Sequence, residues 1–280
     1  MTDVVVTGAS GRLGSALYAY LKGLGSKVIG VTRGDFDLAS PADVSRFVRD
    51  TRPDFLFHPA AMTNVDACER EPEKAYSDNV KATENLARSS IEHGVRFIYF
   101  STDYVFDGEK GEPYIETDTP NPVNVYGRTK LNAEESVTGI VKDYLIIRVS
   151  WLFGVPGDFC SFVLSRLNQG LPLKLTTDHR GAPAYIPDLL SVIWEMAKSG
   201  EQGIFHLVNS GDCTRFEMGN EILSILGMDA EPEAVCGTDV GFLAKRPPQS
   251  VLECSRLKHK FGISLRSWQE ALGDYLKDAG

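Results

Sequence analysis

The chain has 280 residues, of which 42% are hydrophobic and 24% are charged, and its formal net charge is −9. This composition is typical of a globular protein, and the sequence contains no apolar run long enough to cross a bilayer. The acidic balance, together with the absence of a long Lys/Arg cluster, argues against nucleic acids and membranes as partners, so we expect a small-molecule ligand.

The first 32 residues indicate a strand, a helix and a second strand. An apolar run is followed by glycines, then by apolar residues at helical spacing, then by another apolar run. Gly8, Gly11 and Gly14 allow a tight turn, close approach of a pyrophosphate and close packing of helix on strand. The spacing is G-x-x-G-x-x-G rather than G-x-G-x-x-G, but a strand before it and a helix after it favour a dinucleotide site.

The residues after the second strand favour NADPH as the cofactor. Thr32 and Arg33 stand where an NAD-selective protein usually places an acidic residue for the ribose 2′-hydroxyl. Arg33, with Arg12 in the glycine loop, suits a 2′-phosphate instead. Asp35 and Asp37 follow closely, so NADH remains possible.

Later segments continue the alternation of strands and helices. Apolar runs occur at 54–58, 95–100 and 144–149, and helix-like segments at 41–51, 72–93 and 124–138. This pattern predicts an α/β fold with a doubly wound parallel sheet covered on both faces. We assign residues 1–150 to an NADP-binding domain.

Beyond Trp151 the pattern changes. The sequence predicts helices at 158–169, 188–198 and 215–226, short strands at 172–176 and 203–208, and two short helices near the C-terminus. We expect residues 151–280 to form a smaller α/β substrate-binding lobe, interleaved with the last elements of the first domain.

Ligands of open parallel sheets bind beyond the carboxyl ends of the strands. The predicted strand ends offer the segments 8–13, 60–63, 101–104 and 150–151. A helix after them places Tyr126 and Lys130 four residues apart on one face. Such a pair alone is more typical of an ordinary solvated helix face. The residues at the strand ends, which would lie near it, are what favour a catalytic site.

Reduction of a carbonyl needs a hydride on carbon and a proton on oxygen, and a phenol can donate that proton. The usual phenol pKa of about 10 is high for this task. A cation at about 4 Å in an effective dielectric of ~20 is worth roughly 4 kcal/mol. We therefore expect Lys130 to lower the pKa of Tyr126, and Thr102, at a strand end, to hold the carbonyl oxygen.

The five cysteines are odd in number, widely spaced and free of any C-x-x-C motif. This usage argues against a disulfide framework and against a zinc site. We expect no metal ligands and a reducing, cytoplasmic environment.

The motifs TGASGRLG and YGRTK resemble those of the extended short-chain dehydrogenase/reductase family, which has a Rossmann-type sheet. Within it the sequence is most similar to the dTDP-4-dehydrorhamnose reductases, through STDYVFDG, NVYGRTKLNAE, RVSWLFG, DHRGAPAYIPDL and RPPQSVLECSRL. The resemblance implies reduction of the 4-keto group of a 6-deoxy sugar nucleotide, in a cytoplasmic homodimer that makes cell-surface sugars. Substitutions in the substrate lobe, at His179, Ala184, Gln249 and Cys254, leave the exact sugar and base open.

The resemblance also assigns residues to each part of the site. It implies that Thr102, Tyr126 and Lys130 are catalytic. The sugar nucleotide is expected at Thr63, Val65, Asp103, Tyr104 and Trp151. Together with the strand ends, it places the cofactor at Gly8, Ser10, Gly11, Arg12, Leu13, Gly14, Thr32, Arg33, Asp37, Leu38, Ala60, Ala61, Thr63, Tyr126 and Lys130.

Three other functions share parts of this pattern. A sugar-nucleotide dehydratase typically has a glutamate where this chain has Tyr104, which counts against elimination of water. A sugar-nucleotide epimerase would retain NAD tightly without consuming it. The regulatory subunit of methionine adenosyltransferase resembles the same reductases and acts as a binding partner; the presence of Thr102, Tyr126 and Lys130 favours an enzyme.

Overall fold

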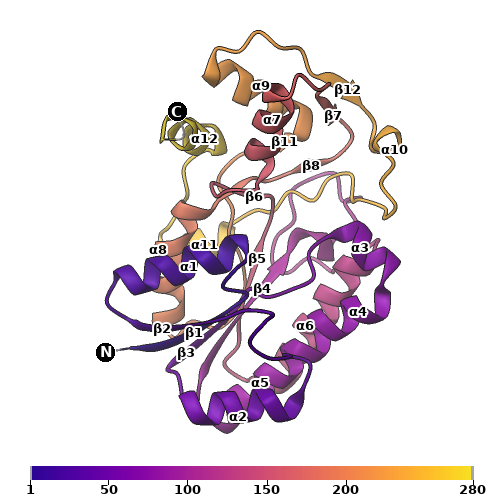
Figure 1. Cartoon of the computed structure of the whole chain (residues 1–280). Coiled ribbons are helices and arrows are strands. Elements are labelled where there is room, and N and C mark those ends of the chain that lie inside the picture. The colour runs from indigo at the N-terminus through magenta and orange to yellow at the C-terminus, as the bar shows by residue number, and fades with distance from the viewer. Residues whose placement is uncertain (1, 279–280) are drawn as a thin grey trace.

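The computed structural model describes residues 2–278, and its centre is a six-stranded parallel sheet (Figure 1). The strand order is β10-β5-β4-β3-β1-β2. The chain leaves β1 for β2 on one side and then returns to β3 on the other side of β1, which creates the switch point where such sheets bind ligands. The strands are β1 (Asp3–Thr7), β2 (Lys27–Val31), β3 (Phe55–His58), β4 (Arg96–Thr102), β5 (Leu145–Val149) and β10 (Gly203–His206).

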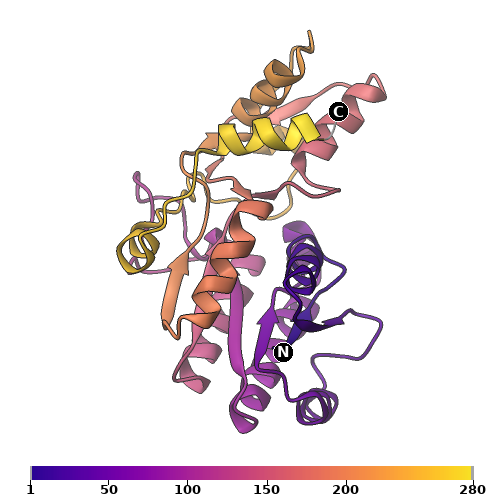
Figure 2. The same cartoon turned by 90° about the vertical axis from the view of Figure 1, so that its left-hand side faces the viewer.

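Helices cover both faces of this sheet, as the sequence predicts (Figures 1 and 2). One face carries α1 (Arg12–Gly23) and α8 (Ile186–Lys198), and the other carries α2 (Pro41–Thr51), α5 (Ala82–Glu92) and α6 (Val125–Ile140). Successive strand residues point to opposite faces. Thus Val4 and Val6 pack with one apolar cluster and Val5 with the other. The α/β fold with a doubly wound parallel sheet is confirmed.

The helix predicted at 72–93 contains a local change of winding. It is made of α4 (Pro72–Tyr76), a π-helical turn η1 (Ser77–Lys81) and then α5. Asn79, in the π turn, donates to Thr129 Oγ1 at 2.9 Å and accepts from Met62 N at 2.7 Å. The turn therefore ties α6 to the loop after β3, where a short helix α3 (Val65–Arg70) begins.

The C-terminal lobe stands over the carboxyl ends of the strands (Figure 1). Its helices are α7 (Phe159–Asn168), α9 (Arg215–Leu226) and α12 (Trp268–Asp278), which enclose a third apolar cluster. Short strand pairs connect them: β6 (Leu152–Phe153) with β9 (Ala184–Tyr185), β7 (Lys174–Thr176) with β12 (Glu233–Val235), and β8 (Arg180–Gly181) with β11 (Cys213–Thr214). Two further helices are α10 (Gly237–Val240) and α11 (Ser255–Phe261).

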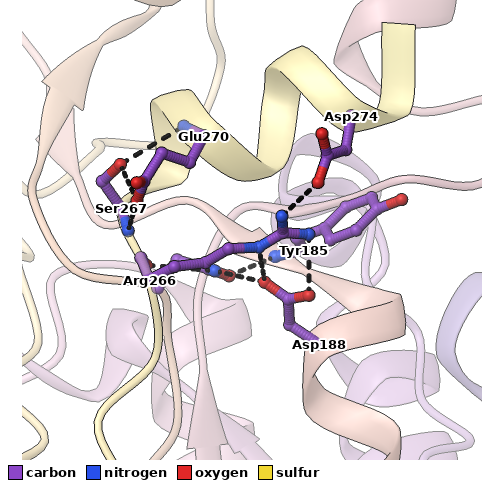
Figure 3. A network of polar contacts seen from close by, with 7 residues as sticks. Tyr185, Asp188, Arg266, Ser267, Glu270 and Asp274 are labelled. Atoms are coloured by element: carbon purple, nitrogen blue, oxygen red, sulfur yellow. Dashed lines mark hydrogen bonds and ion pairs between the residues drawn. The ribbon is translucent and has the colours of Figure 1, made fainter. Parts of the chain in front are cut away.

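The lobe and the sheet share elements. β10 lies far along the chain yet pairs with β5 at the sheet edge, and α8 packs beside α1. Figure 3 shows one fixed connection, in which the guanidinium of Arg266 bonds to Asp188 at the start of α8 and to Asp274 in α12. This bidentate pair fixes α12 relative to the sheet layer. Between residues 2 and 278, no helix is both long enough and apolar enough to span a membrane.

Candidate active site

A cleft of about 1150 Å³ lies between the carboxyl ends of the strands and the C-terminal lobe. Its walls come from the loops after β1 to β5, from the first turn of α6 and from the start of α9. Every residue that the sequence predicts as catalytic, cofactor-binding or substrate-binding lines this cleft. The structure therefore brings the whole predicted set together.

The glycine loop is shaped to lie against a ligand. Gly8 has a φ of +59°, and a Cβ there would come within 2.9 Å of Ala60 Cα. A Cβ at Gly14 would lie 2.1 Å from the carbonyl oxygen of Gly8, so α1 packs directly on the loop. Gly11 caps α1 without a side-chain acceptor, and the first N–H groups of a helix have no intrahelical partner. These features fit a dinucleotide pyrophosphate at the start of α1.

The rim near β2 carries the residues predicted to select the cofactor. The Thr32 backbone N–H and hydroxyl both donate to Asp35, at 2.7 Å, and these bonds lower the pKa of Asp35. Arg33 is largely exposed and lies 3.4 Å from Asp78, which also accepts from Lys74 at 3.1 Å. Two cations, Arg33 and Lys74, thus share the carboxylate of Asp78.

Tyr126 lies in the first turn of α6, which is fixed at its start by Asn124. The Asn124 side chain accepts from Gly127 N at 2.8 Å. A Cβ at Gly127 would lie 2.1 Å from the Tyr104 carbonyl oxygen, so α6 packs closely on the turn η2 (Asp103–Val105). The Tyr126 and Tyr104 rings meet edge to face with centroids 5.8 Å apart. The close packing directs the phenol toward the end of β4, where Thr102 hydrogen-bonds to it.

Lys130 lies one turn after Tyr126 on the same helix and is buried. Its side chain donates to the Phe100 carbonyl at 2.7 Å and lies 4.2 Å above the Tyr99 ring. Burial lowers the pKa of Lys130 to about 7, and the charge of Glu134 opposes that fall. Glu134 is itself buried and accepts two hydrogen bonds, at 2.9 and 2.6 Å, from Arg148.

The prediction that the Tyr126 pKa is lowered, through Lys130, is wrong. Desolvation raises the pKa of the Tyr126 phenol, and a hydrogen bond with Thr102 only partly opposes this rise. The reason is that both groups lie in surroundings of low polarity, which favour the neutral form of each. The phenol is therefore protonated at neutral pH, the state that a proton donor requires.

Asp103 and Trp151 form the wall that faces the lobe. Burial raises the pKa of Asp103 to about 6, against hydrogen bonds from Ser250 and Thr102. Trp151 has a backbone φ of 36°, a left-handed conformation that is uncommon for a bulky residue. Strain of this kind is typical of functional sites.

Some residues that line the cleft were not predicted from the sequence: Phe36, Lys74, Asp78, Phe159 and Arg215. Lys74 lies in α4 and Asp78 in the π turn η1, and the ion pair between Asp78 and Arg33 spans 45 residues. Arg215 begins α9, far along the chain from the other members of the site. No short motif marks such residues, because only the tertiary fold brings them to the cleft.

Known proteins resemble this chain in sequence and in fold. The sequence matches the RmlD substrate binding domain family over residues 1–280. The spore coat polysaccharide biosynthesis protein SpsK of Bacillus subtilis is 36% identical, with 99% of this chain and 98% of that protein covered. A dTDP-4-dehydrorhamnose reductase of Clostridium acetobutylicum superposes with a TM-score of 0.95 at 33% identity, with 99% of each chain covered. The Bacillus anthracis dTDP-4-dehydrorhamnose reductase, solved in complex with NADP, superposes with a TM-score of 0.95 at 31% identity, with 99% of this chain and 100% of that chain covered.

Proposed function

The chain belongs to the RmlD substrate binding domain family, and from this premise we propose that it is an NADPH-dependent oxidoreductase acting on a sugar nucleotide. The reaction is reduction of the 4-keto group of a 6-deoxy sugar, with dTDP-4-dehydro-L-rhamnose as substrate and dTDP-L-rhamnose as product. The observation that carries the proposal is that Thr102, Tyr126 and Lys130 line one cleft together with the glycine loop. Relatives over nearly the whole chain bear the name of this reductase.

The residues of the glycine loop and of the β2 rim would hold NADPH. Gly8, Gly11 and Gly14 leave room for the pyrophosphate at the start of α1, and Arg33 with Lys74 offers positive charge to the 2′-phosphate. NADPH bound there would supply the hydride that reduces the sugar carbonyl. NADH would lack the 2′-phosphate contact and bind more weakly.

Tyr126 acts as the proton donor. Its raised pKa keeps the phenol protonated near neutrality, and its proton is transferred to the C4 oxygen as that oxygen gains negative charge. Thr102, which hydrogen-bonds to the phenol, orients the carbonyl oxygen in the same place. The carbonyl thus becomes a secondary alcohol, and Tyr126 is left as a phenolate.

Lys130 supports this step from one turn along the same helix. Its pKa of about 7 lets it hold or release a proton near neutral pH, so it is suited to return a proton to the phenolate. The Phe100 carbonyl fixes the position of the ammonium group. We further propose, on the family resemblance alone, that the enzyme works as a homodimer in the cytoplasm.

A panel of keto-sugar nucleotides tests the function. Purified protein should oxidise NADPH with dTDP-4-dehydro-L-rhamnose, with one NADP formed for each sugar reduced. Tightly retained NAD that is not consumed would instead identify an epimerase. Absence of turnover with the whole panel, combined with co-purification of a larger synthetase, would identify a regulatory subunit.

A further inference from the structure

Arg215 is a cation that lines the cleft on the lobe side, at the first position of α9. Its guanidinium lies 3.8 Å from the centroid of the Trp151 ring and 4.5 Å from that of Phe159. Stacking on these two rings holds the planar guanidinium in one orientation while leaving its N–H donors available.

Arg215 has no carboxylate partner within residues 2–278. Its guanidinium makes a weak polar contact, from Nη1 to the sulfur of Met218 at 3.9 Å. The neighbouring Arg180, by contrast, binds both Asp212 and Glu217, at 2.5 and 2.7 Å. Burial lowers the pKa of Arg215, which shows that its charge is held at a cost. A desolvated guanidinium without an anion is the arrangement expected of an anion-binding group awaiting its ligand.

The position of Arg215 selects the ligand. Its charge acts on Tyr104 and Asp103, so it lies on the substrate side of the cleft. Asp103 is already engaged by the hydroxyls of Thr102 and Ser250. Among the described residues, the other cations that line the cleft lie in the glycine loop, on the β2 rim or one turn after Tyr126: Arg12, Arg33, Lys74 and Lys130.

Gly181 packs closely against the ring of Trp151. A Cβ at Gly181 would lie 2.6 Å from the Trp151 ring, so only glycine lets the ring occupy this position. Trp151, whose backbone is left-handed, lines the cleft. The Arg215–Trp151 stack is therefore a preformed feature rather than a chance contact of two mobile side chains.

We propose that Arg215 binds the diphosphate of the sugar nucleotide, through N–H donors of its guanidinium and beside the ring of Trp151. This inference rests on the proposed function, since a sugar nucleotide is the substrate assumed. Among the groups of that substrate, only the diphosphate is anionic. The diphosphate is attached to the sugar, so it would lie near the catalytic residues, as Arg215 does. A guanidinium can donate two parallel hydrogen bonds to a phosphate.

The test uses the purified full chain and two probes, dTDP and dTMP, titrated by calorimetry. Arg215→Met should weaken dTDP binding by about 10- to 100-fold, the effect of losing charge-assisted hydrogen bonds. Binding of dTMP should weaken less, so the ratio of dTDP affinity to dTMP affinity should fall. Arg215→Lys, which keeps the charge, should lose less dTDP affinity than Arg215→Met. The NADPH affinity of both variants should stay within twofold of the wild-type value.

Arg166→Met is the matched control, because it removes one positive charge from the same lobe outside the cleft. It should leave the dissociation constants of dTDP and dTMP unchanged. Circular dichroism and the melting temperature establish whether each variant is folded. If Arg215→Met does not fold, the affinities of Arg215→Lys are compared with those of the wild type instead.

Unchanged dTDP affinity in both Arg215 variants would overturn the inference, as would an equal loss for dTDP and dTMP. Neither result would affect the proposed reaction if the wild type reduces its substrate. Conversely, a wild type that binds dTDP through Arg215 but oxidises no NADPH with any keto sugar would refute the reaction and leave the binding site intact.

Discussion

Replacement of Lys130 by methionine should stabilise the folded protein at neutral pH while reducing turnover. Lys130 is 3% exposed, and its pKa falls from the usual 10.5 to about 7. One pKa unit corresponds to about 1.4 kcal/mol, so burial of this amine costs about 4 kcal/mol at pH 7. Methionine fills the space but loses the bond to Phe100 and the contact with the Tyr99 ring, together worth about 2 kcal/mol. A net gain of about 2 kcal/mol remains.

The gain should depend on pH with a definite sign. Because the folded pKa of Lys130 lies below the unfolded value, the unfolded chain binds more protons between pH 7 and pH 10.5. The cost to the wild type is therefore fully present below about pH 7 and is lost as the pH rises toward 10.5. The advantage of the variant should shrink over the same interval.

Urea unfolding of the wild type and of Lys130→Met at pH 6.5, 8.0 and 9.5 measures this difference. Lys22→Met is the control, because Lys22 also lies over an aromatic ring, that of Tyr18, but is exposed to solvent. The control should change the free energy of unfolding by less than about 0.5 kcal/mol at each pH. A Lys130 variant that is less stable than the wild type by the same amount at every pH would refute the reasoning.

Three further substitutions test other parts of the site. Tyr126→Phe should lower kcat by about 10²- to 10⁴-fold while NADPH affinity measured by calorimetry stays within twofold, and wild-type turnover would exclude the phenol as the proton donor. Arg33→Ala should reduce kcat/KM for NADPH more than for NADH; an unchanged ratio would mean that the arginine is only a surface charge. Glu134→Gln should cost about 3–5 kcal/mol in denaturant unfolding, because it leaves Arg148 without its anion in the core, whereas exposed Glu135→Gln should be nearly neutral.

The sheet and its helices follow from local patterns in the sequence. Continuous apolar runs gave the buried strands, and the helix at 41–51 begins where Ser40 caps it and Pro41 takes its first position. Short strands such as β6 and β9 were missed, because two residues carry too little periodicity to be recognised. Their pairing is a consequence of the lobe packing on the sheet.

The site was predictable where a residue's role follows from its neighbours in sequence, as for the glycine loop and the pair Tyr126 and Lys130. The direction of the Tyr126 pKa shift could not be predicted in this way. Helical spacing shows that two groups are near each other, but it does not show that both are buried. Arg215 was missed because its partners, Trp151 and Phe159, lie more than fifty residues before it. Such stacking can be recognised only once the lobe is folded.

The most direct test of the proposed reaction follows the hydride itself. The protein is incubated with dTDP-4-dehydro-L-rhamnose and NADPH carrying deuterium at the transferable position, and the sugar is examined by mass spectrometry and NMR. A reductase that works as proposed places one deuterium on C4 of dTDP-L-rhamnose and forms an equal amount of NADP. Recovery of sugar without deuterium, with the NADPH unconsumed, would contradict the assignment.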